Sequence, residues 1–218
     1  TLQLGSDNAL GNTADVSIAN GADLDVNGKT QTITTLHGVA GSSLNMGNGV
    51  LTIAQGGVSQ GTLTGAGQLN LEGGLMQISG ANAGMSATTR IAAPADVELD
   101  NTQGLGTGDI ALDGTLKLRS ANGILSNQLS GAGTLSLQDS AQVSLTNSLN
   151  TLSGDINVAT GSQLTAFGAG TLGTSSVTDN GTVVLDTATD WTLTNAISGS
   201  GGLTKTGSGT LIVNNGLT

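Results

Sequence analysis

Two short acidic runs contain the residues of this sequence best suited to chemistry. Asp96, Glu98 and Asp100 alternate with apolar residues, as do Asp23 and Asp25. Because successive side chains of a β-strand point to opposite faces, each run would place its carboxylates on one face. Clustered carboxylates on a sheet can ligate Ca²⁺ or supply the acid and base of glycoside cleavage. Asp96, Glu98 and Asp100 are therefore the candidate metal ligands of this chain.

A simpler interpretation is that both runs are solvated strand faces, whose charges oppose edge-to-edge pairing. The sequence contains one Trp, one Phe and no Tyr, so it offers few aromatic platforms for sugar rings. His37 is the only histidine, and a Ser-His-Asp arrangement would depend on it. We therefore predict no enzymatic activity, no catalytic residue and no cofactor, and we favour the solvated-face interpretation over a calcium site.

A glycine-bracketed phrase repeats along the chain. It occurs as LTGAGQL, LSGAGTL and ISGSGGL, with Gly65, Gly131 and Gly199 lying 66 and 68 residues apart. A second phrase (ALG, GLG, TLG) defines units near 10–104, 105–171 and 172–218, of which the first carries 28 extra residues and the last is incomplete. Tolerance of an insertion of about one coil is typical of solenoids, so we expect each unit to be a whole number of coils.

Short apolar pairs with period two predict short strands with one face inward. Examples are Leu116 with Leu118 and Leu135 with Leu137. Turn dipeptides such as Asn180-Gly181 separate the pairs, and we expect Gly181 to adopt a positive φ. A meander of hairpins is the structural competitor. The long repeat and the scarcity of aromatic residues favour an all-β, right-handed parallel β-helix with stacked aliphatic residues, and no segment predicts an α-helix.

Coils of roughly 20 to 28 residues would give about ten coils and a rod of about 50 Å. Residues 1–218 are then a single β-helix segment, and the absence of charged or helical caps predicts a fragment of a longer rod. We expect Trp191 to face inward, and Lys117 and Arg119 to face outward and to pair across coils with acidic neighbours.

Charge and composition exclude several classes of partner. The net charge is −10 with only five Lys and Arg residues, which argues against nucleic acid and against docking on an anionic membrane. No segment is a signal peptide or an apolar span, so we predict no membrane insertion by this segment. The absence of Cys suits a chain that crosses an oxidising compartment.

Two runs resemble a known family. Residues 199–213, GSGGLTKTGSGTLIV, are similar to the strand repeat associated with autotransporter passenger domains of Gram-negative bacteria, and residues 1–27 resemble the segment that follows that repeat. The resemblance implies a right-handed parallel β-helix that is exported through the periplasm and the outer membrane to the cell surface or beyond. It also implies adhesion, autoaggregation or biofilm formation. The second phrase lacks the KTGSGTL continuation, and the family's barrel is absent.

These observations lead to a structural and adhesive stalk as the expected function. Rows of Thr, Ser and Asn would supply many weak hydrogen bonds between two rods, so self-association is the first candidate partnership. A segment that binds a host surface protein, a matrix component or a glycan is the alternative, followed by a glycan-acting enzyme. The repetitive polar face contains no motif that identifies a binding surface or ligand.

Overall fold

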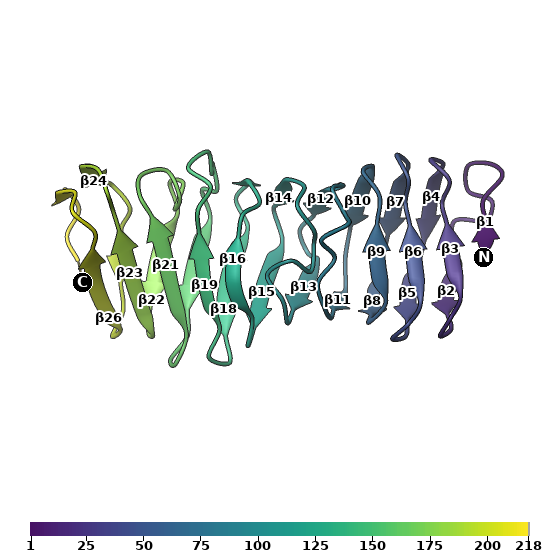
Figure 1. Cartoon of the computed structure of the whole chain (residues 1–218), viewed down its shortest axis with the longest axis horizontal. Coiled ribbons are helices and arrows are strands. Elements are labelled where there is room, and N and C mark those ends of the chain that lie inside the picture. The colour runs from purple at the N-terminus through teal and green to yellow at the C-terminus, as the bar shows by residue number, and fades with distance from the viewer. Residues whose placement is uncertain (218) are drawn as a thin grey trace.

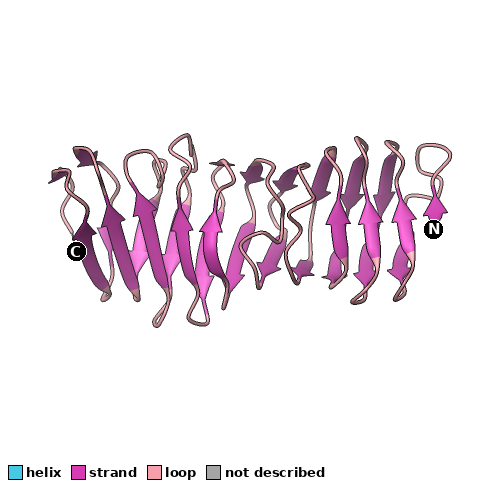
Figure 2. Ribbon diagram, in the orientation of Figure 1, coloured by secondary structure: helices cyan, strands magenta, loops and turns pink. Residues whose placement is uncertain are grey.

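The computed structural model describes residues 1–217 and forms an all-β solenoid of 27 strands without a helix in that range. The chain winds in right-handed coils from one end of a rod to the other (Figures 1 and 2). All strand pairings among these residues are parallel. The predicted parallel β-helix is therefore confirmed, and the hairpin meander is wrong.

One side of the rod carries a ten-stranded sheet, called the long sheet, that runs almost the whole length of the chain. Its strands are β2 (Asp15–Ile18), β5 (Thr35–Gly38), β8 (Gly56–Ser59), β11 (Leu75–Ile78), β13 (Asp96–Leu99), β15 (Thr115–Arg119), β18 (Thr134–Gln138), β20 (Asp155–Val158), β22 (Ser176–Asp179) and β25 (Ile197–Ser198).

The second side is divided into a four-stranded and a five-stranded sheet, which face the viewer in Figure 1. The four-stranded sheet contains β1 (Leu2–Gln3), β3 (Asp23–Asp25), β6 (Ser43–Asn45) and β9 (Thr62–Thr64). The five-stranded sheet contains β16 (Asn122–Leu125), β19 (Gln142–Leu145), β21 (Gln163–Phe167), β23 (Thr182–Asp186) and β26 (Gly202–Thr206).

The third side carries a six-stranded and a two-stranded sheet. The six-stranded sheet contains β4 (Thr30–Ile33), β7 (Val50–Ile53), β10 (Gln68–Leu71), β12 (Thr88–Ile91), β14 (Ile110–Leu112) and β17 (Leu129–Ser130). The two-stranded sheet contains β24 (Trp191–Leu193) and β27 (Leu211–Val213).

Each coil is 19 to 21 residues long. This length separates successive ladder partners on the long sheet, from Val16 through Leu36 to Ile197 and Leu217. Residues 1–217 make about eleven turns. At the usual spacing of ~4.8 Å between strands, this stack is about 50 Å long.

The core is a set of aliphatic columns, each formed by residues that stack at one position in successive coils. Leu135, for example, is 0% exposed and lies between Leu116 and Ile156. Trp191 is buried, as predicted, and the methionines also fill the core. Such like-on-like stacking lets a chain with almost no aromatic residues exclude water from its interior.

The repeat seen in the sequence is not a whole number of coils, contrary to our expectation. Gly65 follows β9, Gly131 follows β17 and Gly199 follows β25, so the three phrases lie on three different sides of the rod. Their spacing of 66 to 68 residues corresponds to about three and a third coils. The 28 extra residues of the first unit likewise exceed one coil. Each repeat therefore displaces the phrase by one side, and Thr218, which ends the third unit, lies outside the described residues.

Buried asparagines connect the two repeated phrases across coils. The side chain of Asn82 accepts the N–H of Leu63 at 2.8 Å and donates to the carbonyl of Gly104 at 2.8 Å. Asn150, 68 residues later, accepts the N–H of Leu129 at 2.8 Å and donates to Thr171 O at 2.8 Å. Both asparagines are nine-tenths or more buried, so each satisfies backbone groups that water cannot reach.

A second pair of asparagines repeats at the same interval. Asn127 donates to the carbonyls of Gly106 and Gly108 at 3.2 and 2.6 Å. Asn195 donates to Gly173 O and Ser175 O at 3.2 and 2.9 Å. Where a repeated phrase interrupts the strands on one side, these asparagine clasps replace the ladder hydrogen bonds. The clasps, rather than the coil, are thus the element that the repeat conserves.

Gly181 does not adopt a positive φ, and that expectation is wrong. Positive φ occurs at other predicted turn glycines, such as Gly21 and Gly28, but not at Gly181. A Cβ atom at Gly181 would instead overlap the carbonyl oxygens of Ser162 and Ala159 in the preceding coil. Close approach of two coils therefore explains this glycine.

We predict that Gly181→Val lowers the free energy of unfolding by more than about 1 kcal/mol, because the added side chain would force adjacent coils apart. Thr182→Val is the matched control, since Thr182 is a half-buried strand residue, and it should be nearly neutral. Urea denaturation followed by circular dichroism measures both. Equal midpoints for the two variants would show that this close approach carries no cost.

Candidate functional site: a polar cluster on the long sheet

The predicted acidic run lies on the outer face of the long sheet beside two basic residues. Alternation along β13 turns Asp96 and Glu98 outward, and alternation along β15 turns Lys117 and Arg119 outward. The parallel register sets Glu98 directly beside Lys117. The sheet therefore brings opposite charges together from adjacent coils, as the sequence predicted.

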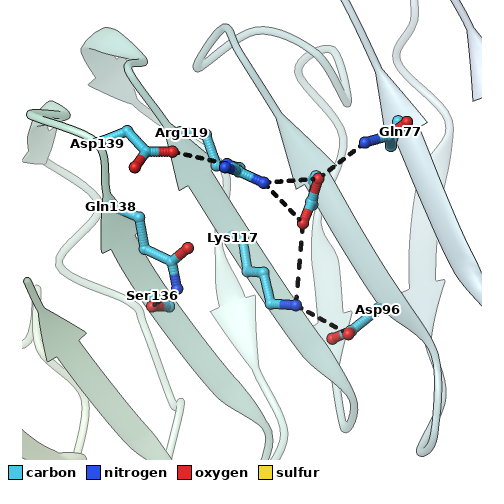
Figure 3. A network of polar contacts seen from close by, with 8 residues as sticks. Gln77, Asp96, Lys117, Arg119, Ser136, Gln138 and Asp139 are labelled. Carbon is cyan, nitrogen blue, oxygen red and sulfur yellow. Dashed lines mark hydrogen bonds and ion pairs between the residues drawn. The ribbon is translucent and has the colours of Figure 1, made fainter.

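The charges form one connected network (Figure 3). Lys117 Nζ lies 2.8 Å from Asp96 Oδ2 and 4.0 Å from Glu98 Oε1. Arg119 Nη1 lies 3.3 Å from Glu98 Oε1, and its Nε lies 2.7 Å from Asp139 Oδ2 in the following coil. The network thus links three coils through five side chains.

The network is partly exposed, so its contribution to stability is modest. The Arg119 and Asp139 side chains are 47% and 50% exposed. A hydrogen bond and the charge of Asp139, followed by the charge of Glu98, raise the pKa of Arg119 above its usual value. Water and salt screen exposed pairs of this kind, which is why such bridges add little individually.

Asp100, the third predicted ligand, lies apart from the ion pairs. Its Oδ1 accepts the backbone N–H of Gly80 at 2.9 Å. Asp96 and Glu98 already face the ammonium and guanidinium groups of the adjacent strand. In residues 1–217, no group of three or more His, Asp or Glu side chains is arranged to hold a metal ion. The geometry places Lys117 and Arg119 where a calcium site would need a cation.

The other sequence candidates occupy simple surface positions. His37 is exposed on β5, and its ladder neighbours Ser17 and Val58 include no acid. Asp23 accepts hydrogen bonds from the hydroxyls of Ser43 at 2.6 Å and Thr1 at 2.9 Å, and these bonds lower its pKa. Hydroxyl-to-carboxylate bonds along a column connect coils but create no reactive centre.

One buried acid was missed by the sequence analysis. Asp179 occupies an inward position in β22 and is 4% exposed. Burial raises its pKa, although the backbone N–H groups of Gly181 and Val183 partly oppose this shift by donating to the carboxylate. No local signal marks the position, since Asp179 resembles a turn residue before Asn180-Gly181. Only the strand register shows that it faces the core.

We predict that Asp179→Asn raises the melting temperature at pH 7. A carboxyl whose pKa is raised by folding stabilises the protein while protonated, and this contribution is lost as the pH rises through the folded-state pKa. The wild type should therefore lose stability between about pH 4 and pH 7 relative to the variant. Thermal melts of both proteins across this range measure the difference. A wild-type advantage that grows with pH would contradict the assignment.

The five-stranded sheet presents a second surface feature, because its outer face is nearly uncharged. Its outward residues are Thr, Ser, Asn, Gln, Gly and a few apolar side chains, and the only charged one is Asp186. Ile124 and Phe167 are 55% and 46% exposed there. The long sheet, in contrast, has outward carboxylates from β2 to β20.

Within residues 1–217, no helix is long and apolar enough to cross a membrane. No protein-family model matches the sequence, and no solved structure matches it. Two proteins of Escherichia coli strain K12 do match. The uncharacterized lipoprotein YdeK is 45% identical over 215 residues, which cover 99% of this chain and 16% of YdeK. The uncharacterized protein YuaQ is 47% identical over 210 residues, which cover 96% of this chain and 15% of YuaQ. The chain therefore spans about a sixth of the length of these curated relatives.

Proposed function

We propose that this chain is a segment of a stiff adhesive rod at the bacterial cell envelope, and that the rod associates with copies of itself through the five-stranded sheet. The observation that carries the proposal is the distribution of charge. A chain with a net charge of −10 repels its copies, so contact between copies is favoured where charge is lowest. The five-stranded sheet, with Asp186 as its only outward charge, is that surface.

The long sheet is a poor alternative for contact between rods. Asp15, Asp96, Glu98 and Asp155 face outward along it. In a symmetric pair, both copies present the same surface, so like charges would meet across the interface. Self-contact through the long sheet would therefore bury uncompensated carboxylates.

One segment can supply only a weak contact. Five strands spaced at ~4.8 Å and about five residues long cover about 350 Å² per partner, well below the roughly 800 Å² of a standard stable interface. Hydrogen bonds between neutral groups add only about 0.5–1.5 kcal/mol each. Tight adhesion then requires many such contacts along a longer rod, and the lengths of the two relatives are compatible with that requirement.

Resemblance to autotransporter passenger repeats supports the adhesive role and a location on the cell surface. The name of one relative, a lipoprotein, supports a location at the envelope. Binding to a host protein or a matrix component remains the alternative role, and mixing experiments distinguish it.

Cells that display the parent protein test the proposal in a settling assay. Displaying and bare cells are mixed after labelling with different dyes, with and without a calcium chelator. We expect clumps that contain only displaying cells and that persist in chelator. Inclusion of bare cells would favour a receptor on the partner cell. Complete loss of clumping in chelator would show that a metal ion bridges acidic side chains such as Asp96.

A further inference from the structure

A shallow pocket of about 260 Å³ lies on the long sheet, next to the ion-pair network. Two rows of outward side chains form its walls. One row contains Val58, Gln77 and Glu98, and the other contains residues two positions further along the same strands and their turns, including Gln60 and Asp100. The pocket spans β8, β11, β13 and the end of β15, on the outer surface of four consecutive coils.

We infer that this pocket binds one residue of a neutral saccharide. Its size is below that of pockets for drug-sized ligands and suits a single sugar ring. The inference is independent of the proposed self-association, which uses another sheet.

The donors and acceptors of the pocket match the hydroxyl groups of a sugar. Each hydroxyl donates one hydrogen bond and accepts up to two. Glu98 and Asp100 supply carboxylate acceptors, while Gln60, Gln77 and Arg119 supply N–H donors. The exposed ends of these side chains can therefore pair with adjacent hydroxyls of one ring. The half-buried side chain of Val58 offers an apolar surface to the C–H face of the ring.

The existing contacts of the pocket favour a neutral ligand over a charged one. Glu98 already accepts from Gln77 at 3.0 Å and from Arg119 at 3.3 Å, and Asp100 accepts from Gly80. A charged ligand would have to break these pairs and lose its own hydration. The two carboxylates outnumber the one guanidinium, which adds repulsion against an anionic sugar.

Chemical-shift mapping of the ¹⁵N-labelled protein tests the inference with free glucose, galactose, mannose and N-acetylglucosamine, and with glucuronic acid and glucosamine as charged probes. Ligands of this size bind at best in the millimolar range, so titrations should reach about 50 mM. We expect at least one neutral sugar to shift the amides of Gln60, Gln77 and Arg119 with saturation, and glucuronic acid to bind more weakly.

Two variants and one control complete the test. Gln77→Ala removes a donor from the wall, and Ser79→Leu fills the pocket, and each should weaken binding at least tenfold. Gln142→Ala makes the same change as Gln77→Ala at an exposed position of β19 and should leave binding unchanged. Absence of saturable shifts in the wild type would overturn the inference. So would shifts on another face, binding of only the charged probes, or equal binding by folded pocket variants.

Discussion

Leu135→Asp is expected to unfold the coils around β18. Leu135 is 0% exposed, and its stacked neighbours Leu116 and Ile156 provide no partner for a charge. Burying an unpaired carboxylate there should cost more than about 4 kcal/mol, a large part of the stability of a typical domain. Circular dichroism and thermal melting should show loss of β-structure or a strongly lowered melting temperature.

Asn157→Asp is the control for this substitution. Asn157 lies on the outer face of the next strand, β20, beside Ser136 and Thr178. The change adds the same charge without entering the core, and its effect should stay within about 0.5 kcal/mol. If Leu135→Asp melts like the wild type, the assigned inward face is wrong.

Asn150→Leu should have the second-largest effect, because it removes an asparagine clasp. The substitution leaves the N–H of Leu129 and the C=O of Thr171 buried without a partner. Each orphaned group costs about 1–3 kcal/mol, so the free energy of unfolding should fall by about 2–5 kcal/mol. Urea denaturation measures this loss.

Asn150→Asp and Asn147→Leu make the clasp test specific. An aspartate keeps the acceptor for Leu129 but turns a second oxygen toward Thr171 O, so its pKa should rise and its stability should improve at acidic pH. Asn147 makes comparable bonds to Ser126 O and from Leu149 N but is only half-buried, so water can replace it and its loss should cost less. Equal losses for Asn147→Leu and Asn150→Leu would contradict the role of buried clasps.

The sequence was sufficient to predict the coils and their inward residues. Period-two pairs such as Leu116 and Leu118 predict strands directly, because a half-buried strand must alternate. The same alternation correctly predicted that Lys117 and Arg119 face outward and pair with acidic neighbours. These features depend only on local order along the chain.

The remaining features depend on register between coils, which no local pattern reveals. The repeat of about three and a third coils was missed because the coil length was unknown, and with it the role of Asn150. Gly181 was assigned a positive φ because Asn-Gly often forms such turns, whereas contact with the preceding coil is the actual constraint. Asp179 was missed because its inward position follows only from its ladder partner Val158.

Sedimentation velocity of residues 1–218 from about 10 μM to about 1 mM tests self-association through the five-stranded sheet most directly. The double variant Ile124→Asp/Thr165→Asp places two charges in one outward column of that sheet, two coils apart. The control Thr32→Asp/Asn70→Asp places the same charges two coils apart on the six-stranded sheet. We predict that the weight-average sedimentation coefficient rises with concentration for the wild type and the control but stays at the monomer value for the first variant. A wild type that remains monomeric throughout, or equal behaviour of the two variants, would contradict the proposed contact surface.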